Sequence, residues 1–305
     1  MKQRTRFSII AALMLALPQG AWAQSARPPQ VVPVGALASP PVLDGVLGEW
    51  GNSAWTQIKV APAIAANERK KYGLDPEDRN VTGVLTAELK AGVAQGRLYV
   101  AVRWPDSSAD TEYKGWEWLG GKYIEGKKRD DALALRFHMS GDFDRSMMSA
   151  KNYQADVWFW SAARTNPSGL AEDWTHHLSV RPIEDAAEYE VEGVGTVYIK
   201  KIRDSGSGIY KPIPRPKEKG AEKLPSFELI KQPSGSVADV GAKGRWAGGK
   251  WALEMVRSLN TGHADDVVFS PGKKILGQLA VFNRGSDENK SVSEPLLFDF
   301  GAAGN

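Results

Sequence analysis

Two adjacent methionines of this sequence could bind a metal-containing cofactor, whereas the lysine considered with them indicates no site by itself. Met147 and Met148 are adjacent in a polar stretch, residues 141–154, where a place in an apolar core does not readily explain them. The methionine thioether is a soft, neutral ligand that suits haem iron and tends to raise its potential, although the same side chain also fills gaps in cores. Lys290 begins the segment Lys-Ser-Val-Ser, which follows an apolar run ending at Phe282. An amine binds a metal only when deprotonated, and burial beside a metal cation favours that form.

The histidines offer a second kind of ligand. His176 and His177 follow Trp174. Adjacent residues of a strand point to opposite faces, so at most one of the two can face a given site. Either is an alternative to the methionine and lysine ligands. His138 and His263 have nothing around them that resembles a ligand cluster, and without cysteine or a His-x-x-x-His spacing a structural zinc site is not expected.

Composition and charge exclude several functions. The chain of 305 residues has no cysteine, which rules out disulfides, iron–sulfur clusters and covalently attached c-type haem. Without the three basic residues at positions 2, 4 and 6, the 39 Lys and Arg fall to 36 and balance the 36 Asp and Glu. A neutral mature chain gives no electrostatic case for binding nucleic acid or an anionic membrane. Asp130 and Asp131 precede an apolar run and are interpreted as the end of a turn, not as a catalytic pair.

Residues 1–23 have the pattern of a secretory signal. Basic residues come first, an apolar run from Phe7 to Leu17 follows, and Ala21-Trp-Ala23 fits the rule for signal cleavage. Arg4 and Arg6 are separated by Thr5, which favours the general secretion route. No later apolar run approaches the roughly 18 residues that a membrane-spanning helix needs. We therefore expect cleavage near Ala23 and a periplasmic protein without a membrane span.

The rest of the chain is predicted to be all-β. Short apolar or alternating runs lie between Gly, Pro, Asp and Asn residues, a pattern typical of a single β-sandwich with long loops and few short helices. Gly248-Gly249 is interpreted as a two-residue hairpin turn. Residues 61–72 and 183–190 are the two candidate helices. The predicted strands are Val81–Leu89, Arg97–Trp104, Ala132–Phe137, Ala155–Trp160, Val194–Ile202, Gly244–Trp246, Lys250–Arg257, Lys274–Phe282 and Leu296–Phe300.

Residues 24–305 are expected to form one domain. Within it, residues 203–243 are rich in Gly, Pro and charged side chains. Such a stretch buries little apolar surface and is predicted to be an irregular surface insertion. The strands that follow it are expected to pair with those before it.

Three motifs, taken together, resemble a known family. They are Pro41-Val-Leu-Asp-Gly-Val-Leu-Gly-Glu-Trp50, the double-tryptophan segment from Gly244 to Leu259, and Lys290-Ser-Val-Ser after Phe282. Their order and spacing resemble the haem-binding γ subunits found with ethylbenzene dehydrogenase and related molybdoenzymes of the type II DMSO-reductase family. The first motif also resembles the opening of family 9 carbohydrate-binding modules. Here Glu294-Pro295 stands where the family commonly has a tryptophan and an aromatic residue.

The resemblance implies a non-covalent haem b with a methionine and a lysine as its axial ligands. It assigns these roles to Met148 and Lys290, with Met147 as the next candidate and Met139 as the third. Trp160 is expected at the cofactor pocket, at one end of the sandwich. His176 and His177 stay open as alternative ligands. The implied function is electron transfer, without catalysis by this chain itself, between molybdoenzyme and iron–sulfur subunits and a periplasmic cytochrome. Two alternatives stay open, a secreted carbohydrate-binding module and a haem-free structural subunit.

Overall fold

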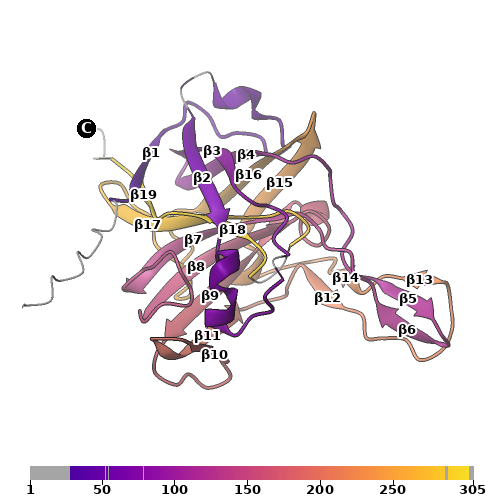
Figure 1. Ribbon diagram of the computed structural model, residues 1–305. Helices are drawn as coiled ribbons and strands as arrows, with labels where there is room; N and C mark the ends of the chain where they lie inside the picture. Colours follow the sequence, from indigo (N-terminus) through magenta and orange to yellow (C-terminus); the bar gives the residue numbers. More distant parts are fainter. Residues whose placement is uncertain (1–27, 52, 54, 78, 286–287, 302–305) are drawn as a thin grey trace, which may run out of the picture.

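The computed structural model describes residues 28–51, 53, 55–77, 79–285 and 288–301, and the expected signal segment lies outside them. The chain is all-β, as predicted, and its helices are short 3-10 turns (Figure 1). Across the described residues, no helix has the length and apolar character needed to cross a membrane. The 3-10 turns are η1 (Leu47–Trp50), η2 (Ala66–Tyr72), η3 (Asn166–Ser168) and η4 (Ser236–Ala238). The strands are β1 (Gln30–Ala36), β2 (Thr56–Pro62), β3 (Leu85–Ala94), β4 (Arg97–Pro105), β5 (Trp116–Leu119), β6 (Lys122–Glu125), β7 (Ala132–Gly141), β8 (Tyr153–Ser161), β9 (Leu170–Ser179), β10 (Ala187–Val191), β11 (Gly195–Arg203), β12 (Tyr210–Pro212), β13 (Lys223–Leu224), β14 (Phe227–Leu229), β15 (Val240–Ala247), β16 (Lys250–Ser258), β17 (Lys274–Phe282), β18 (Ser291–Ser293) and β19 (Leu296–Asp299).

The main sheet folds into two layers that are joined at their edges. One layer follows the order β2-β3-β4-β16-β15, and the other follows β17-β7-β8-β9. β18 bonds to both β17 and β2, while β15 bonds to β9, so the hydrogen bonding runs around both sides of the sandwich. β11 and then β10 extend the second layer beyond β9. This second layer carries the candidate site on its outer face.

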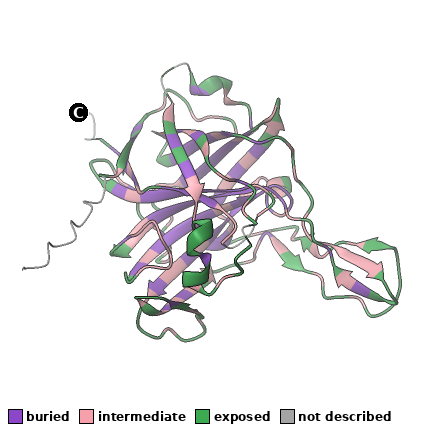
Figure 2. Cartoon of the chain, in the orientation of Figure 1, coloured by how far each residue is buried: buried purple, intermediate pink, exposed green. Residues whose placement is uncertain are grey.

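The core between the layers is built from alternating strand residues. Val100, Val102 and Trp104 point inward from β4, and Trp158 and Trp160 point inward from β8. Trp104 lies 6.1 Å from Trp160 and 6.2 Å from Trp251, centroid to centroid. Figure 2 shows the buried residues concentrated along these strands. A second apolar cluster, with Ala134, Val157 and Phe282 among its members, covers the opposite face of β7, β8 and β17.

Most predicted strands are confirmed, and the hairpin turn is as expected. Ala247 pairs with Lys250, so Gly248 and Gly249 form the whole turn, with positive φ angles of 57° and 77° that favour glycine. In place of the candidate helix at residues 61–72, the structure has only the 3-10 turn η2. The candidate helix at 183–190 is wrong, because β10 pairs with β11 there in antiparallel register.

The segment expected to be irregular holds short strands. β12 pairs with β14, and β13 joins β5 and β6 in a three-stranded sheet. In Figure 1 this small sheet projects from the body as an arm, and Figure 2 shows mostly exposed and half-buried residues along it. Trp118 packs there against Tyr123, with a 5.0 Å centroid distance. As expected, the strands after the insertion pair with earlier ones, since β16 bonds to β4 along its whole length.

Candidate functional site

A cavity of about 310 Å³ lies on the outer face of the second layer. Its floor is formed by neighbouring strands β17, β7, β8, β9 and β11. Its cover comes from residues 145–148, from Gly285, Glu288 and Lys290, and from Ala63, Ile64 and Leu74. The volume is at the lower end of the roughly 300–1,000 Å³ that is usual for cofactor clefts. The cavity lies against a sheet face, whereas the sequence analysis expected the cofactor pocket at one end of the sandwich.

The cavity brings the adjacent residues Met147 and Met148 together with Lys290, which lies more than a hundred residues further along the sequence. Both methionines also pack against the second apolar cluster, so they serve the packing of this face as well. The Lys290 ammonium lies 5.8 Å from the centroid of the Phe282 ring. Met139, the third methionine considered, does not line the cavity.

One short segment at the end of β2 positions both loops that carry the candidate ligands. Arg145 donates to the carbonyl oxygens of Ala61, Pro62 and Ala63 at 3.1 to 3.4 Å. The backbone N–H of Ala63 donates to the carbonyl oxygen of Lys290 at 2.9 Å. The methionine loop and the lysine loop are thus tied to the same three residues, which explains why they meet over one cavity.

His176 faces the cavity and His177 does not, in agreement with strand alternation. The Nδ1 atom of His176 is buried and has no hydrogen-bond partner. Burial, and then the positive charges of Lys201, Arg136 and Lys290, hold the pKa of His176 well below its usual value. The imidazole is therefore neutral at pH 7, the form that can bind a metal ion. The Nδ1 atom of His177 instead lies 3.5 Å from the amide nitrogen of Gln154.

Trp160 does not line the cavity, in contrast to its expected place at the cofactor. It is fully buried between the layers and donates through Nε1 to Asn166 Oδ1 at 3.1 Å. Its neighbour Phe159 has the opposite orientation and lines the cavity, as Val157 does. The strand is apolar on both faces, so its sequence alone did not show which face carries the site.

Arg136 places a buried positive charge in the cavity wall. Its side chain is 5% exposed. It donates to the Tyr153 hydroxyl at 3.0 Å, to the carbonyl oxygens of Asp144 and Arg145, and to Gln278 Oε1. All of these acceptors are neutral, and none of the described ion pairs includes Arg136. A buried guanidinium without a counter-anion is costly, so this wall favours a ligand that carries a negative group.

Two other charged side chains at the cavity are paired within the protein. Arg164 pairs with Asp130 at 3.2 Å and lies 3.9 Å from the Tyr113 ring centroid. Glu172 pairs with Arg203 at 2.8 Å. Asp130 is thus the ion-pair partner of a cavity arginine.

The sequence reasoning missed Arg136, Arg164 and Glu172 as site residues. The available signal was the arginine inside the apolar run Ala132–Phe137, where a charged side chain must be buried or paired. Glu172 belongs to β9, which was not among the predicted strands.

The model of the ethylbenzene dehydrogenase family matches residues 52–293. No curated protein matches the chain in sequence. One similar solved structure is a family 9 carbohydrate-binding module from Caldicellulosiruptor kristjanssonii in complex with glucose, at 9% identity, 88% coverage of this chain, 85% coverage of that chain and a TM-score of 0.33. A second is a carbohydrate-binding protein from Bacteroides uniformis, described as putative, at 8% identity, 88% and 91% coverage and a TM-score of 0.39. At these scores the two likenesses carry no conclusion about the ligand.

Proposed function

This chain belongs to the ethylbenzene dehydrogenase family, and we propose that it is a haem b electron carrier whose cofactor binds without covalent attachment in the cavity described above. The observation that carries the proposal is the meeting of two thioethers, one amine and one neutral imidazole at a single largely apolar cavity. Thioether, amine and imidazole nitrogen are ligands that suit haem iron. The group would supply one-electron transfer, and this chain would perform no bond chemistry itself.

Met148 and Lys290 would hold the haem iron, and Met147 and His176 are the alternatives that also line the cavity. The two loops approach from the cover and His176 stands on the floor. Burial of Lys290 beside a metal cation favours its neutral amine. Phe159 and Phe282 would form apolar walls for a planar ring and exclude water from it.

Arg136 would hold a carboxylate of the porphyrin. It is the buried guanidinium of this cavity that has no carboxylate partner among the described residues. A charge-assisted hydrogen bond to a propionate supplies the missing anion. Its neutral partners Gln278 and Tyr153 hold the guanidinium in place on β7.

The location and partners are part of the same proposal. The pattern of residues 1–23 supports export and signal cleavage near Ala23, which gives a periplasmic protein of one domain. The family supports a complex with a molybdenum enzyme and its iron–sulfur subunit, or exchange of electrons with a periplasmic cytochrome.

Haem titration of the mature chain is the test of this function. We expect a saturable Soret band at one haem per chain, with sharp α and β bands on reduction. In Ala134→Trp, an indole projects from β7 into the cavity, since Ala134 lines it and is 5% exposed. We expect this variant to bind haem at least about 100-fold more weakly, a loss of about 2.7 kcal/mol.

The control is Val84→Trp, because Val84 is 62% exposed and lies outside the cavity. It should bind haem like the wild type, and circular dichroism should show that both variants keep their strands. Absence of a Soret band in the wild type, or equal binding by Ala134→Trp, contradicts the proposal. Sugar binding by a protein that takes up no haem would favour the carbohydrate-binding alternative.

A further inference from the structure

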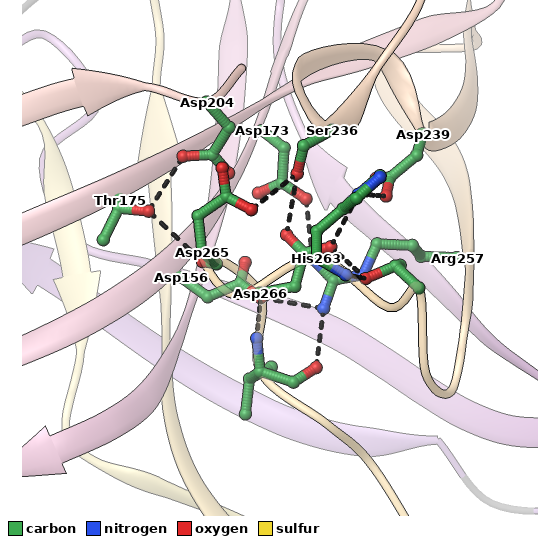
Figure 3. A network of polar contacts seen from close by, with 12 residues as sticks. Asp156, Asp173, Thr175, Asp204, Ser236, Asp239, Arg257, His263, Asp265 and Asp266 are labelled. Carbon is green, nitrogen blue, oxygen red and sulfur yellow. Dashed lines mark hydrogen bonds and ion pairs between the residues drawn. The ribbon is translucent and has the colours of Figure 1, made fainter. Parts of the chain in front are cut away.

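A group of six aspartates, four buried and two half-buried, lies on the inner side of β9, away from the haem cavity. They come from β8, β9, the end of β11, the turn after η4 and the loop between β16 and β17 (Figure 3). Arg257 on β16 and His263 lie among them. The six are Asp156, Asp173, Asp204, Asp239, Asp265 and Asp266.

Arg257 satisfies one part of this group. Its guanidinium is 2.8 Å from Asp156, 2.6 Å from Asp173 and 3.2 Å from Asp266. Arg257, Asp156 and Asp173 have fully buried side chains. This first triad of carboxylates therefore already contains its cation.

In a second triad only Asp266 is already paired, with the Arg257 guanidinium. Asp204, Asp265 and Asp266 each offer an oxygen, and these oxygens lie within 4.8 Å of one another. None of the ion pairs among the described residues involves Asp204 or Asp265. Figure 3 shows the carboxylates of these two residues turned toward each other. Ser236 Oγ adds a hydroxyl, at 3.1 Å from Asp265 Oδ1.

Asp204 points independently to a missing ligand. Its side chain is 5% exposed, and its Oδ1 accepts from Thr175 Oγ1 at 2.8 Å. Its Oδ2 is buried and has no hydrogen-bond partner. Burial, together with the nearby charge of Asp265, raises the pKa of Asp204 to about 7, although the Thr175 hydrogen bond opposes that rise. A buried carboxylate oxygen without a donor is costly and is normally satisfied by a proton, a water or a cation.

We propose that Asp204, Asp265 and Asp266 bind a divalent cation of the calcium type. The donors are all oxygens, which hard cations prefer, and calcium tolerates the irregular geometry that three separate loop residues provide. Water and the Ser236 hydroxyl complete the coordination. The cation links the end of β11 to the loop between β16 and β17.

The site also lies directly behind the haem cavity. Thr175, which contacts Asp204, is followed on β9 by His176, which faces the cavity. The two side chains point to opposite faces of the strand. The cation site shares no residue with the cavity lining. The sequence expectation that His263 lacks a ligand cluster is wrong, since its Nδ1 lies 3.4 Å from Asp239 and 3.5 Å from Asp266.

Calcium titration of the mature protein after removal of metals with EDTA tests this site. We expect calorimetry to give one calcium per chain, and thermal unfolding to show a saturable rise in Tm with added calcium. Sodium chloride at matched ionic strength should not reproduce the rise, and magnesium should give a smaller one because it demands near-octahedral geometry. A wild-type protein that binds no calcium at millimolar concentration overturns the proposal, whatever the variants do.

Asp204→Asn and Asp265→Asn locate the site. Asparagine keeps the size of the side chain, so Asp204→Asn can still accept from Thr175, but each variant removes one ligand charge. We expect each to weaken calcium binding at least about tenfold, because ligand charge sets affinity. Asp142→Asn is the matched control, since Asp142 is exposed and outside the group. Equal calcium affinity in wild type and both variants would place the ion elsewhere and sink the assignment.

Discussion

Replacing Lys290 with alanine is expected to leave the haem-loaded protein with one protein ligand to the iron. The amine is the group that the lysine loop brings to the cavity, and Ala63 fixes the backbone of that loop through the Lys290 carbonyl oxygen. We expect the low-spin spectrum to give way to a high-spin or water-ligated one, and haem affinity to fall at least about tenfold, or about 1.4 kcal/mol. Absorption and electron paramagnetic resonance spectra of the ferric protein measure both effects.

Lys274→Ala is the matched control for this substitution. Lys274 has a 59% exposed side chain and pairs with Asp299 at the start of β17, outside the cavity. It should leave the spectrum unchanged. If Lys290→Ala keeps the wild-type spectrum while His176→Ala loses it, the imidazole on the cavity floor is the ligand and the lysine assignment is wrong.

The two methionines are distinguished by the same spectra. Loss of the thioether ligand should lower the reduction potential or abolish the low-spin state, because a soft ligand favours the reduced iron. We expect this for Met148→Ala, a smaller change for Met147→Ala, and none for Met139→Ala, which lies outside the cavity lining. A change confined to Met147→Ala would exchange the roles of the two neighbours.

Replacing Arg257 with methionine is expected to have the largest effect on stability. The guanidinium is fully buried and pairs with Asp156, Asp173 and Asp266. Its removal leaves buried carboxylates without a counter-charge, which typically costs about 3–5 kcal/mol of unfolding free energy. Urea unfolding followed by tryptophan fluorescence measures the loss. Asp173→Asn in the Arg257→Met background should recover part of it, because one uncompensated charge disappears.

Arg79→Met is the surface counterpart of this change. Arg79 is 61% exposed and pairs with Asp75 and Glu77, and exposed pairs contribute about 0–1 kcal/mol. An Arg257→Met protein as stable as Arg79→Met would mean that the buried network does not hold β8, β9 and β16 together in solution.

Alternation along the strands was predictable from the sequence, but the choice of face was not. In β8 the residues Val157 and Phe159 share one face, and Trp158 and Trp160 share the other. Both faces are apolar, because one packs in the core and the other lines the cavity. The tertiary structure decides which face of β8 packs against the other layer and which face lines the cavity. For this reason the sequence could not show that Trp160 faces the core, whereas Met147, Met148 and Lys290 lie in or beside loops and line the cavity.

Charged strands and distant partners were also beyond the sequence. β9 contains Glu172 and Asp173 on opposite faces, and both are buried. They are tolerated because Arg203 and Arg257, far along the chain, compensate them. Local patterns do not show such pairs, so β9 was missed, and with it the aspartate group. The helix predicted at residues 183–190 was wrong for a similar reason. β10 is an edge strand because it pairs with β11, and a local sequence pattern does not show that pairing.

The position of the iron tests the central claim most directly. Crystals of the haem-loaded mature protein, measured at the iron absorption edge, should give one anomalous peak in the cavity over β7, β8 and β9. The account predicts this peak between the sulfur of Met148 or Met147 and Lys290 Nζ, with a porphyrin carboxylate at Arg136. A peak outside the cavity, or no iron in protein crystallised with excess haem, would contradict it.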